Sequence, residues 1–251
     1  MRGVARERGC GMLRLSSDRE GLADKKSHVF SLVGKALVAD ASGALYWPGE
    51  RLLVVADLHL EKGSSAAPRG FLLPPYDTRE TLIALAGVIE AYEPATVVAL
   101  GDSFHDAGAE ARISADDVAA LQILQEGRRW IWITGNHDPE IPARFGGEIA
   151  DEIEVSGLTL RHTPTPAPAT HEIAGHMHPA ACVSLFGHSV RRPCFVGNGR
   201  RIVVPAFGAY TGGLNVLDRA FEPLFGVDGM QVIMLGQDGV YPVATRLLRG
   251  D

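Results

Sequence analysis

The sequence reads Leu52-Leu53-Val54-Val55-Ala56-Asp57-Leu58-His59 after the turn residues Pro48-Gly49, so five apolar residues lead directly into an aspartate and a histidine. A short apolar run bounded by turn residues is typical of a strand that is buried on both faces. Asp57 and His59 therefore stand at the carboxyl end of a predicted strand. Layered sheet proteins collect their ligands beyond such strand ends.

Four further apolar runs end in the same way, each followed by polar residues that can bind a ligand. In chain order, 96–100 is followed by Gly101-Asp102, 130–134 by Gly135-Asn136-His137-Asp138, 158–160 by His162, and 172–174 by Gly175-His176-Met177-His178. Loops at strand ends bring together groups that are distant in sequence. We therefore expect five strand ends to converge on one site.

The residue types at these strand ends fit a pair of divalent cations about 3.5 to 4 Å apart. Such a pair needs a bridging carboxylate, further oxygen donors and neutral imidazoles, with open positions for a water-derived nucleophile and a phosphate oxygen. The candidate metal ligands are Asp57, His59, Asp102, Asn136, His162, His176 and His178. Glycine at 101, 135 and 175 lets the backbone turn sharply there. The sequence thus indicates a two-metal phosphoesterase.

Strands are predicted at both ends of the chain, with helices between them. Three apolar runs separated by turn residues lie within 29–56, and 232–235 and 240–243 flank Gln237-Asp238-Gly239 as a hairpin. A capping box at Asp77-Thr78-Arg79-Glu80 predicts the start of one helix. Ser114 is the expected N-cap of a second helix, which should stop at Gly127. This order predicts an α/β fold, α+β layered, with mixed sheets and helices on the outer faces.

Length and composition favour one globular domain. Of the 251 residues, 46% are hydrophobic and 22% charged, which is ordinary for a packed protein. We expect the domain to span 28–251, and 1–27 to be a disordered extension because it lacks clear periodicity. That segment has no continuous apolar centre, and no stretch reaches membrane-spanning length. A cytoplasmic location without membrane contact is therefore expected.

Charge and missing signatures exclude several classes of function. The net charge of −6 argues against extensive nonspecific DNA binding, so any nucleic-acid contact must be local. The three cysteines form no Cys-x-x-Cys pair, which argues against a disulfide framework or a cysteine zinc site. The glycine-rich loops of P-loop and dinucleotide-binding proteins and the Gly-x-Ser-x-Gly elbow of serine hydrolases are also missing.

In both composition and order, the five strand-end motifs resemble those of the calcineurin-like metallophosphoesterases. The segments 44–48, 57–62, 101–105 and 205–213 are similar, more closely, to the bacterial ligase-associated DNA damage response phosphoesterases, the PdeM family. The resemblance covers about 29–225. It implies the calcineurin-like fold, in which two mixed β-sheets pack as a sandwich with helices on the outer faces.

The resemblance also implies roles for the site residues. One metal ion would be held by Asp57, His59 and His178, and the other by Asn136, His162 and His176, with Asp102 bridging both. A metal-bridging hydroxide would attack phosphorus in line. His137 would stabilise the transition state or protonate the leaving oxygen, and Asp138 would orient its ring. Glu61 departs from the glycine that the close family more often carries, a position that bears on the site rim.

The resemblance implies a DNA phosphodiesterase or endonuclease in a ligase-associated repair system. Two divalent ions are expected, with manganese favoured and iron or zinc as alternatives. The implied partners are a phosphodiester substrate, such as DNA, and a ligase, a helicase and an exonuclease. Two other functions stay open: a small-molecule or cyclic-nucleotide phosphoesterase, and a non-catalytic repair scaffold.

Some polar residues outside the ligand set remain candidates for weaker roles. Arg191 and Arg192, with Arg200 and Arg201, are interpreted as flanking a turn at Gly197-Asn198-Gly199, and the first two are candidate substrate contacts. A solvent-exposed pair of strands with charged ends explains these four arginines equally well. His105 is interpreted as packing or hydrogen bonding behind the ligands rather than as a catalytic group.

Overall fold

The computed structural model describes residues 26–66, 76–168, 171–185, 187–225 and 229–251. Its α-helices are α1 (Lys62–Ala66), α2 (Asp77–Tyr92), α3 (Ala109–Arg112), α4 (Ala115–Gln125) and α5 (Glu222–Phe225). Short 3-10 helices span Pro48–Glu50, Ala143–Phe145, Arg219–Phe221 and Thr245–Leu247. The strands are β1 (Ser27–Leu32), β2 (Lys35–Asp40), β3 (Leu45–Trp47), β4 (Leu52–Val55), β5 (Thr96–Leu100), β6 (Arg129–Ile133), β7 (Glu148–Ala150), β8 (Glu152–Val155), β9 (Leu158–Arg161), β10 (Glu172–Ala174), β11 (Pro179–Leu185), β12 (His188–Gly197), β13 (Arg201–Val203), β14 (Leu214–Asn215), β15 (Gln231–Leu235), β16 (Val240–Val243) and β17 (Leu248–Arg249).

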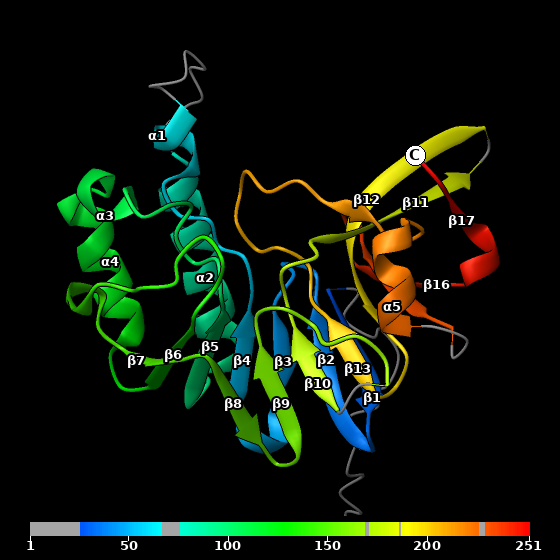
Figure 1. Cartoon of the computed structure of the whole chain (residues 1–251), viewed down its shortest axis with the longest axis horizontal. Helices are drawn as coiled ribbons and strands as arrows, with labels where there is room; N and C mark the ends of the chain where they lie inside the picture. The colour runs from blue at the N-terminus through cyan, green and yellow to red at the C-terminus, as the bar shows by residue number, and fades with distance from the viewer. Residues whose placement is uncertain (1–25, 67–75, 169–170, 186, 226–228) are drawn as a thin grey trace, which may run out of the picture.

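Over these ranges the strands form two mixed sheets. The first runs β1-β2-β3-β4-β5-β6-β7 and is antiparallel up to β4, then parallel from β4 to β7. The second runs β14-β11-β12-β13-β10-β9-β8, with β15 on β12 and β17 on β11. Figure 1 shows α2, α3 and α4 on one side of the molecule and α5 on the other. The predicted sandwich of mixed sheets with outer helices is confirmed.

Strand β4 is held on both faces because its side chains alternate between two cores. Leu52 and Val54 lie in the core between the two sheets, whereas Leu53 and Val55 lie in the core beneath α2 and α4. Strands β5 and β6 divide their side chains in the same way. Full burial of each such side chain contributes about 1.5 to 3 kcal/mol. The carboxyl ends of these strands are therefore fixed in position.

The second predicted helix begins as expected. Ser114 caps α4 by accepting a hydrogen bond at its Oγ from the Asp117 backbone N–H at 3.1 Å. The helix ends at Gln125, two residues before the glycine that was expected to stop it. The local sequence is sufficient here because cap and stop are both short-range signals.

The predicted capping box at the start of α2 is wrong. The N-cap is Tyr76, which makes no side-chain cap hydrogen bond, and Asp77 is already the first helical residue. The Asp77 carboxylate instead accepts a hydrogen bond at 2.9 Å from the backbone N–H of Gly63 in α1. The Asp77 side chain, which the local pattern assigned to the helix cap, thus makes a tertiary contact between α1 and α2 instead.

Two long hairpins complete the second sheet. The predicted β15–β16 hairpin is present, and its turn is closed by a hydrogen bond of 2.7 Å from Gly236 N to Gly239 O. The β11–β12 hairpin extends away from the body of the molecule in Figure 1. Arg191 and Arg192 lie within β12, opposite β11, so the interpretation that they flank the turn at 197–199 is wrong.

Arg201 is unavailable as a phosphate contact. It is 2% exposed on β13, and its Nη2 lies 3.3 Å from Oε1 of Glu172, which is fully buried. Its Nη1 donates to the Thr165 carbonyl at 2.5 Å. Burying a guanidinium requires such partners. The pair therefore joins β13 to β10 and to the loop that follows β9.

The amino-terminal boundary differs slightly from the prediction. Ser27, assigned to the extension 1–27, is the first residue of β1, and 1–25 lie outside the described residues. No helix in the described ranges is long and apolar enough to cross a membrane.

Candidate metal centre

The ends of β4, β5 and β6 meet those of β9 and β10 at one edge of the sandwich. Strands β4 to β6 are parallel, as are β9 and β10, so their carboxyl ends share an edge in each sheet. Contact between the sheets is direct, because Nε2 of His162 lies 3.4 Å from Oδ2 of Asp102. The structure thus brings the candidate ligands of all five motifs together.

Three of these ligands form a first donor group. One ligand atom from each of Asp57, His59 and His178 lies within 4.8 Å of the other two. The two imidazoles face each other with Nε2 atoms 3.2 Å apart, and Nε2 of His178 is 3.4 Å from Oδ1 of Asp57. That oxygen is buried and has no hydrogen-bond partner within the part of the chain that the structure describes. A buried acceptor without a donor is costly, and a cation between these atoms would satisfy it.

A second donor group adjoins the first. Asp102, His162 and His176 again place ligand atoms within 4.8 Å of one another. Nδ1 of His176 is 3.1 Å from Nε2 of His162, and Oδ1 of Asn136 is 3.0 Å from the same nitrogen. Asp102 also lies 4.0 Å from Nε2 of His59, so it stands between the two groups. This is the position that a bridging carboxylate occupies.

The protonation states of His59 and Asp102 suit cation binding. Burial and the neighbouring His178 lower the pKa of His59 to about 3, which keeps the imidazole neutral. Burial acts to raise the pKa of Asp102, but hydrogen bonds from His162 and from the His137 N–H outweigh it and lower that pKa to about 2. Metal ligands must be neutral imidazoles and ionised carboxylates. The donor set therefore fits two divalent ions.

The pKa of His162 responds to the two negatively charged carboxylates that lie near it. Burial acts to lower its pKa, yet Asp102 and Asp57 raise it above the ordinary value. Its Nδ1 is held by the carbonyl oxygen of Leu100 at 2.8 Å, so Nε2 faces the donor group. Fixing one ring nitrogen on a carbonyl is how proteins orient a ligating histidine.

Backbone strain is concentrated at the candidate ligands. Five of them have positive φ: Asp57 (53°), His59 (43°), Asp102 (47°), His176 (68°) and His178 (44°). The left-handed region costs a non-glycine residue about 1 to 2 kcal/mol. Rigid strands on both sides hold these residues there. The strained backbone conformation directs the side chains of these five residues toward one point, and the surrounding fold offsets its energetic cost.

Two glycines permit this close approach. A Cβ at Gly101, where φ is 75°, would come within 2.5 Å of the His162 ring. A Cβ at Gly135 would lie 2.2 Å from the backbone nitrogen of Asp102. Both positions require glycine, since any side chain would separate the motifs.

Asp138 does not orient the His137 ring, contrary to the prediction. Its carboxylate accepts four backbone N–H bonds, from Asp102, Ser103, Phe104 and Gly135, at 2.7 to 3.1 Å. Burial raises the pKa of Asp138 to about 6. Asp138 therefore fixes the loop that carries Asp102 and remains a positioning residue.

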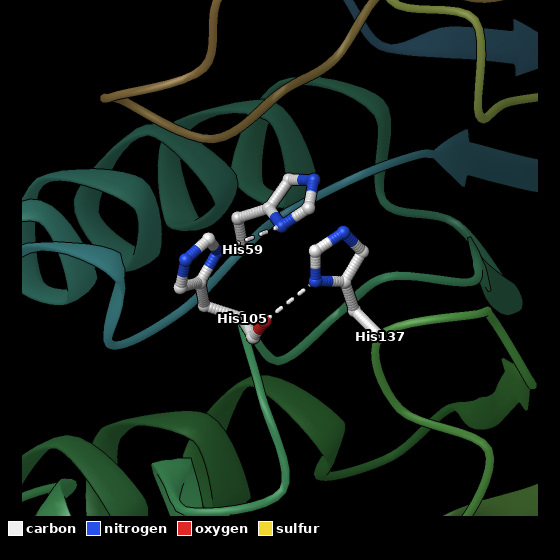
Figure 2. Close-up of side chains that lie close together, drawn as sticks. All are labelled: His59, His105 and His137. Carbon is white, nitrogen blue, oxygen red and sulfur yellow. Dashed lines mark hydrogen bonds between the residues drawn. The ribbon is translucent and has the colours of Figure 1, made fainter. Parts of the chain in front are cut away.

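His105 performs the task expected of Asp138. Its carbonyl oxygen lies 2.7 Å from Nδ1 of His137, and its ring stacks on that of His137 with centroids 5.4 Å apart. Nδ1 of His105 is 3.4 Å from Nδ1 of His59. Figure 2 shows the three rings gathered around one space. Sequence reasoning placed His105 behind the ligands, but its link to His137 follows from loop geometry that has no local signal.

Glu61 does not project into the site rim. It has a φ of 68°, which explains why glycine suits this position, and it is 7% exposed. Its carboxylate accepts hydrogen bonds from Thr78 Oγ1 at 2.9 Å and from Ser64 Oγ at 2.6 Å. The side chain therefore joins α1 to α2, and these bonds offset the strain of a non-glycine residue.

Two adjoining groups of carboxylate and imidazole donors at the edge of a two-sheet sandwich define the class of two-metal hydrolases. The family comparison agrees, since residues 50–203 match the model described as calcineurin-like phosphoesterase. The chain belongs to that family, which uses a dinuclear divalent metal centre. It is therefore a metal-dependent phosphoesterase, a hydrolase of phosphoric ester bonds.

Solved structures give a further comparison. The nuclease MPE of Pseudomonas putida is 28% identical with a TM-score of 0.67, and the match covers 86% of this chain and 100% of that one. YfcE, a phosphoesterase from E. coli, is 14% identical with a TM-score of 0.37, over 79% of this chain and 96% of that one. No curated protein matches the chain.

Proposed function

We propose that this phosphoesterase is a phosphodiesterase that cleaves DNA within a ligase-associated repair system. The observation that carries the proposal is similarity over most of the chain to a nuclease, with a TM-score of 0.67, together with a donor set that suits two cations. The proposed metal ligands are the six residues of the two donor groups together with Asn136. Partnership with a ligase, a helicase and an exonuclease belongs to the same proposal.

Divalent cations held by these residues would supply a nucleophile from water and neutralise charge on the phosphate. The chain's own residues position the remaining groups. His137 must donate from Nδ1 to the His105 carbonyl, because a carbonyl oxygen only accepts. Its Nε2 lies 4.0 Å from Oδ2 of Asp102 and so faces the donor groups. From there a protonated His137 can donate to a phosphate oxygen or to a leaving oxygen.

Removal of metal should abolish activity. We expect protein dialysed against a chelator to hydrolyse bis(4-nitrophenyl) phosphate at least about 100-fold more slowly, because donor groups alone supply no nucleophile. Manganese should restore the rate, since imidazole and carboxylate ligands without thiolate accept that ion readily. The measurement is initial rate against added metal, with metal content by elemental analysis. Full activity in metal-free protein would exclude this function.

A small-molecule phosphoesterase is the second candidate, and the pairing of surface arginines favours it. Arg79 lies 2.7 Å from Asp117, Arg129 lies 2.6 Å from Glu148, and Arg191 lies 3.0 Å from Asp251. In each pair the carboxylate neutralises the positive charge of the arginine, which is then less available to attract DNA. Initial rates on single-stranded DNA, on a small diester and on a phosphate monoester separate the two candidates. Monoester turnover without DNA cleavage would favour the small-molecule enzyme.

Substitution of Arg191 and Arg192 tests whether a DNA substrate extends beyond the metal centre. Arg191 is hydrogen bonded at Nη2 to the Gly213 carbonyl, and the N–H of the next residue, Leu214, donates to the His178 carbonyl at 2.8 Å. The double change to alanine should lower DNA cleavage about 3- to 10-fold more than small-diester hydrolysis. Each lost phosphate contact should also reduce the salt slope of DNA binding by about 0.7 to 0.9. Unchanged DNA cleavage and salt slope would remove both arginines from the substrate surface.

A further inference from the structure

Three histidines, His59, His105 and His137, follow the ends of the neighbouring parallel strands β4, β5 and β6. Backbone contacts hold the loops that carry them together. Leu60 forms a parallel bridge with Phe104, and the His105 N–H donates to the Leu60 carbonyl at 2.9 Å. Nδ1 of His137 donates to the His105 carbonyl at 2.7 Å. The three rings are therefore gathered in advance around the space seen in Figure 2.

The spacing of these rings fits a tetrahedral cation. Each of the three histidines offers a ligand atom within 4.8 Å of the other two. Nδ1 of His59 and Nδ1 of His105 are 3.4 Å apart, beyond the about 2.7 to 3.2 Å usual for hydrogen bonds donated by N–H. Two imidazole nitrogens on a tetrahedral zinc ion, each about 2.0 to 2.1 Å from it, are about 3.3 to 3.4 Å apart. The separation of the two Nδ1 atoms thus suits an ion between them.

The chemistry of this group differs from that of the two donor groups already described. Each of those contains a carboxylate, whereas the third donor group, His59, His105 and His137, consists of three imidazoles. Carboxylate and water oxygens suit manganese, and imidazole nitrogens suit zinc. Three histidines that leave a fourth position open to water are an established zinc arrangement. Zinc is therefore the cation that this group favours.

We propose that the third donor group binds a zinc ion, and that this ion inhibits the phosphoesterase. The site can be reached from solution, because the His137 side chain is 41% exposed. Nδ1 of His137 donates to the His105 carbonyl, so Nε2 is the atom that this residue gives to the ion. A zinc ion on Nε2 occupies the position from which a protonated His137 would donate to the substrate.

His59 gives a second reason for inhibition. Its Nε2 lies 3.2 Å from Nε2 of His178 in the first donor group, and its Nδ1 faces His105. A neutral imidazole has one nitrogen with a proton and one with a free lone pair. When Nδ1 binds zinc, the proton moves to Nε2, which can then no longer bind a cation in the first donor group. Zinc in the third group therefore weakens the first.

Zinc binding to the full-length protein tests the site directly. Wild type, His105→Phe and His137→Ala are dialysed to equilibrium against zinc in the presence of a large excess of manganese, and both metals are measured by elemental analysis. Phenylalanine keeps the ring of His105 and removes its nitrogens. We expect one tightly bound zinc ion in the wild type, and at least about 100-fold weaker binding in both variants, since loss of a residue behind the ligands already costs 10- to 100-fold. This measurement needs no substrate, so it is independent of the proposed cleavage of DNA.

A matched control is His188→Phe, which removes an exposed imidazole from β12, outside the third donor group. It should bind zinc as the wild type does. Zinc that only replaced manganese in the first two donor groups would bind to all four proteins alike, and that result would overturn the proposal. If His105→Phe failed to fold, as judged by thermal unfolding, His137→Ala would decide the binding test, because its ring is already half-exposed.

Inhibition is measured as the rate on bis(4-nitrophenyl) phosphate against zinc concentration, relative to the zinc-free rate of the same protein. The wild type and His188→Phe should slow at least about 10-fold as the site fills, because the first donor group loses its cation. His105→Phe should keep most of its own zinc-free rate at the same zinc concentration. Equal inhibition of His105→Phe and wild type would refute inhibition through this site, as would a wild type that binds the zinc ion without slowing.

Discussion

Asp102→Ala should lose both metal ions and almost all phosphodiesterase activity. Asp102 stands between the two donor groups, since its Oδ2 lies 3.4 Å from His162 and 4.0 Å from His59. Its Oδ1 also accepts the His137 backbone N–H at 2.8 Å. We expect turnover to fall on the order of 10³-fold or more, because the charge stabilisation supplied by both cations is lost together.

Elemental analysis after dialysis provides the decisive measurement for Asp102. A matched control is Asp151→Ala, which removes a carboxylate that accepts from Thr134 Oγ1 at 2.9 Å outside the donor groups. The control should keep both ions and the wild-type rate. If Asp102→Ala retained two ions per chain, the bridging position would belong to another residue.

Buried strands were predictable from the sequence because their signal is local. Strand β5 begins and ends where the apolar run 96–100 does. Strand β4 ends one residue before its run does, and β6 is shifted by one residue at each end. Side chains of these strands enter a core on both faces, so nearly every position must be apolar. The candidate ligands follow those runs directly, which is why the sequence also indicated where the site lies.

The β11–β12 hairpin could not be predicted in the same way. Positions 188 to 193 of β12 are exposed or half-buried and include Arg191, Arg192 and Pro193. A strand of this kind has neither a continuous apolar run nor a clean alternation. Its position is set by pairing with β11, a tertiary contact that the local pattern does not encode.

Within the site, the candidate ligands could be proposed from the sequence, but the contacts behind them could not. Asp138 holds the Asp102 loop through four backbone N–H groups, and the His105 carbonyl holds His137. Both arrangements depend on where two loops meet, so spacing along the chain does not reveal them. Glu61 illustrates the same limit, because only the structure shows its carboxylate turned toward α2.

His137→Ala should separate catalysis from metal binding. The His137 ring is about 41% exposed. Its Nε2 lies 4.0 Å from Oδ2 of Asp102 and its ring meets that of His59 edge-on, but His137 belongs to neither of the two donor groups, so both ions should remain bound. Turnover on DNA should fall by about 10² to 10⁴-fold, the contribution typical of a positioned proton donor.

The choice of substrate identifies what His137 contributes. If it protonates the leaving oxygen, bis(4-nitrophenyl) phosphate should be affected much less than DNA, because a nitrophenolate departs without a proton whereas a sugar alkoxide does not. If it stabilises charge on the phosphate, both substrates should slow to a similar degree. The donor position of Nδ1, fixed by the His105 carbonyl, leaves Nε2 to carry the mobile proton and favours the first result. Metal loss equal to that of Asp102→Ala would contradict either role and would place His137 among the ligands.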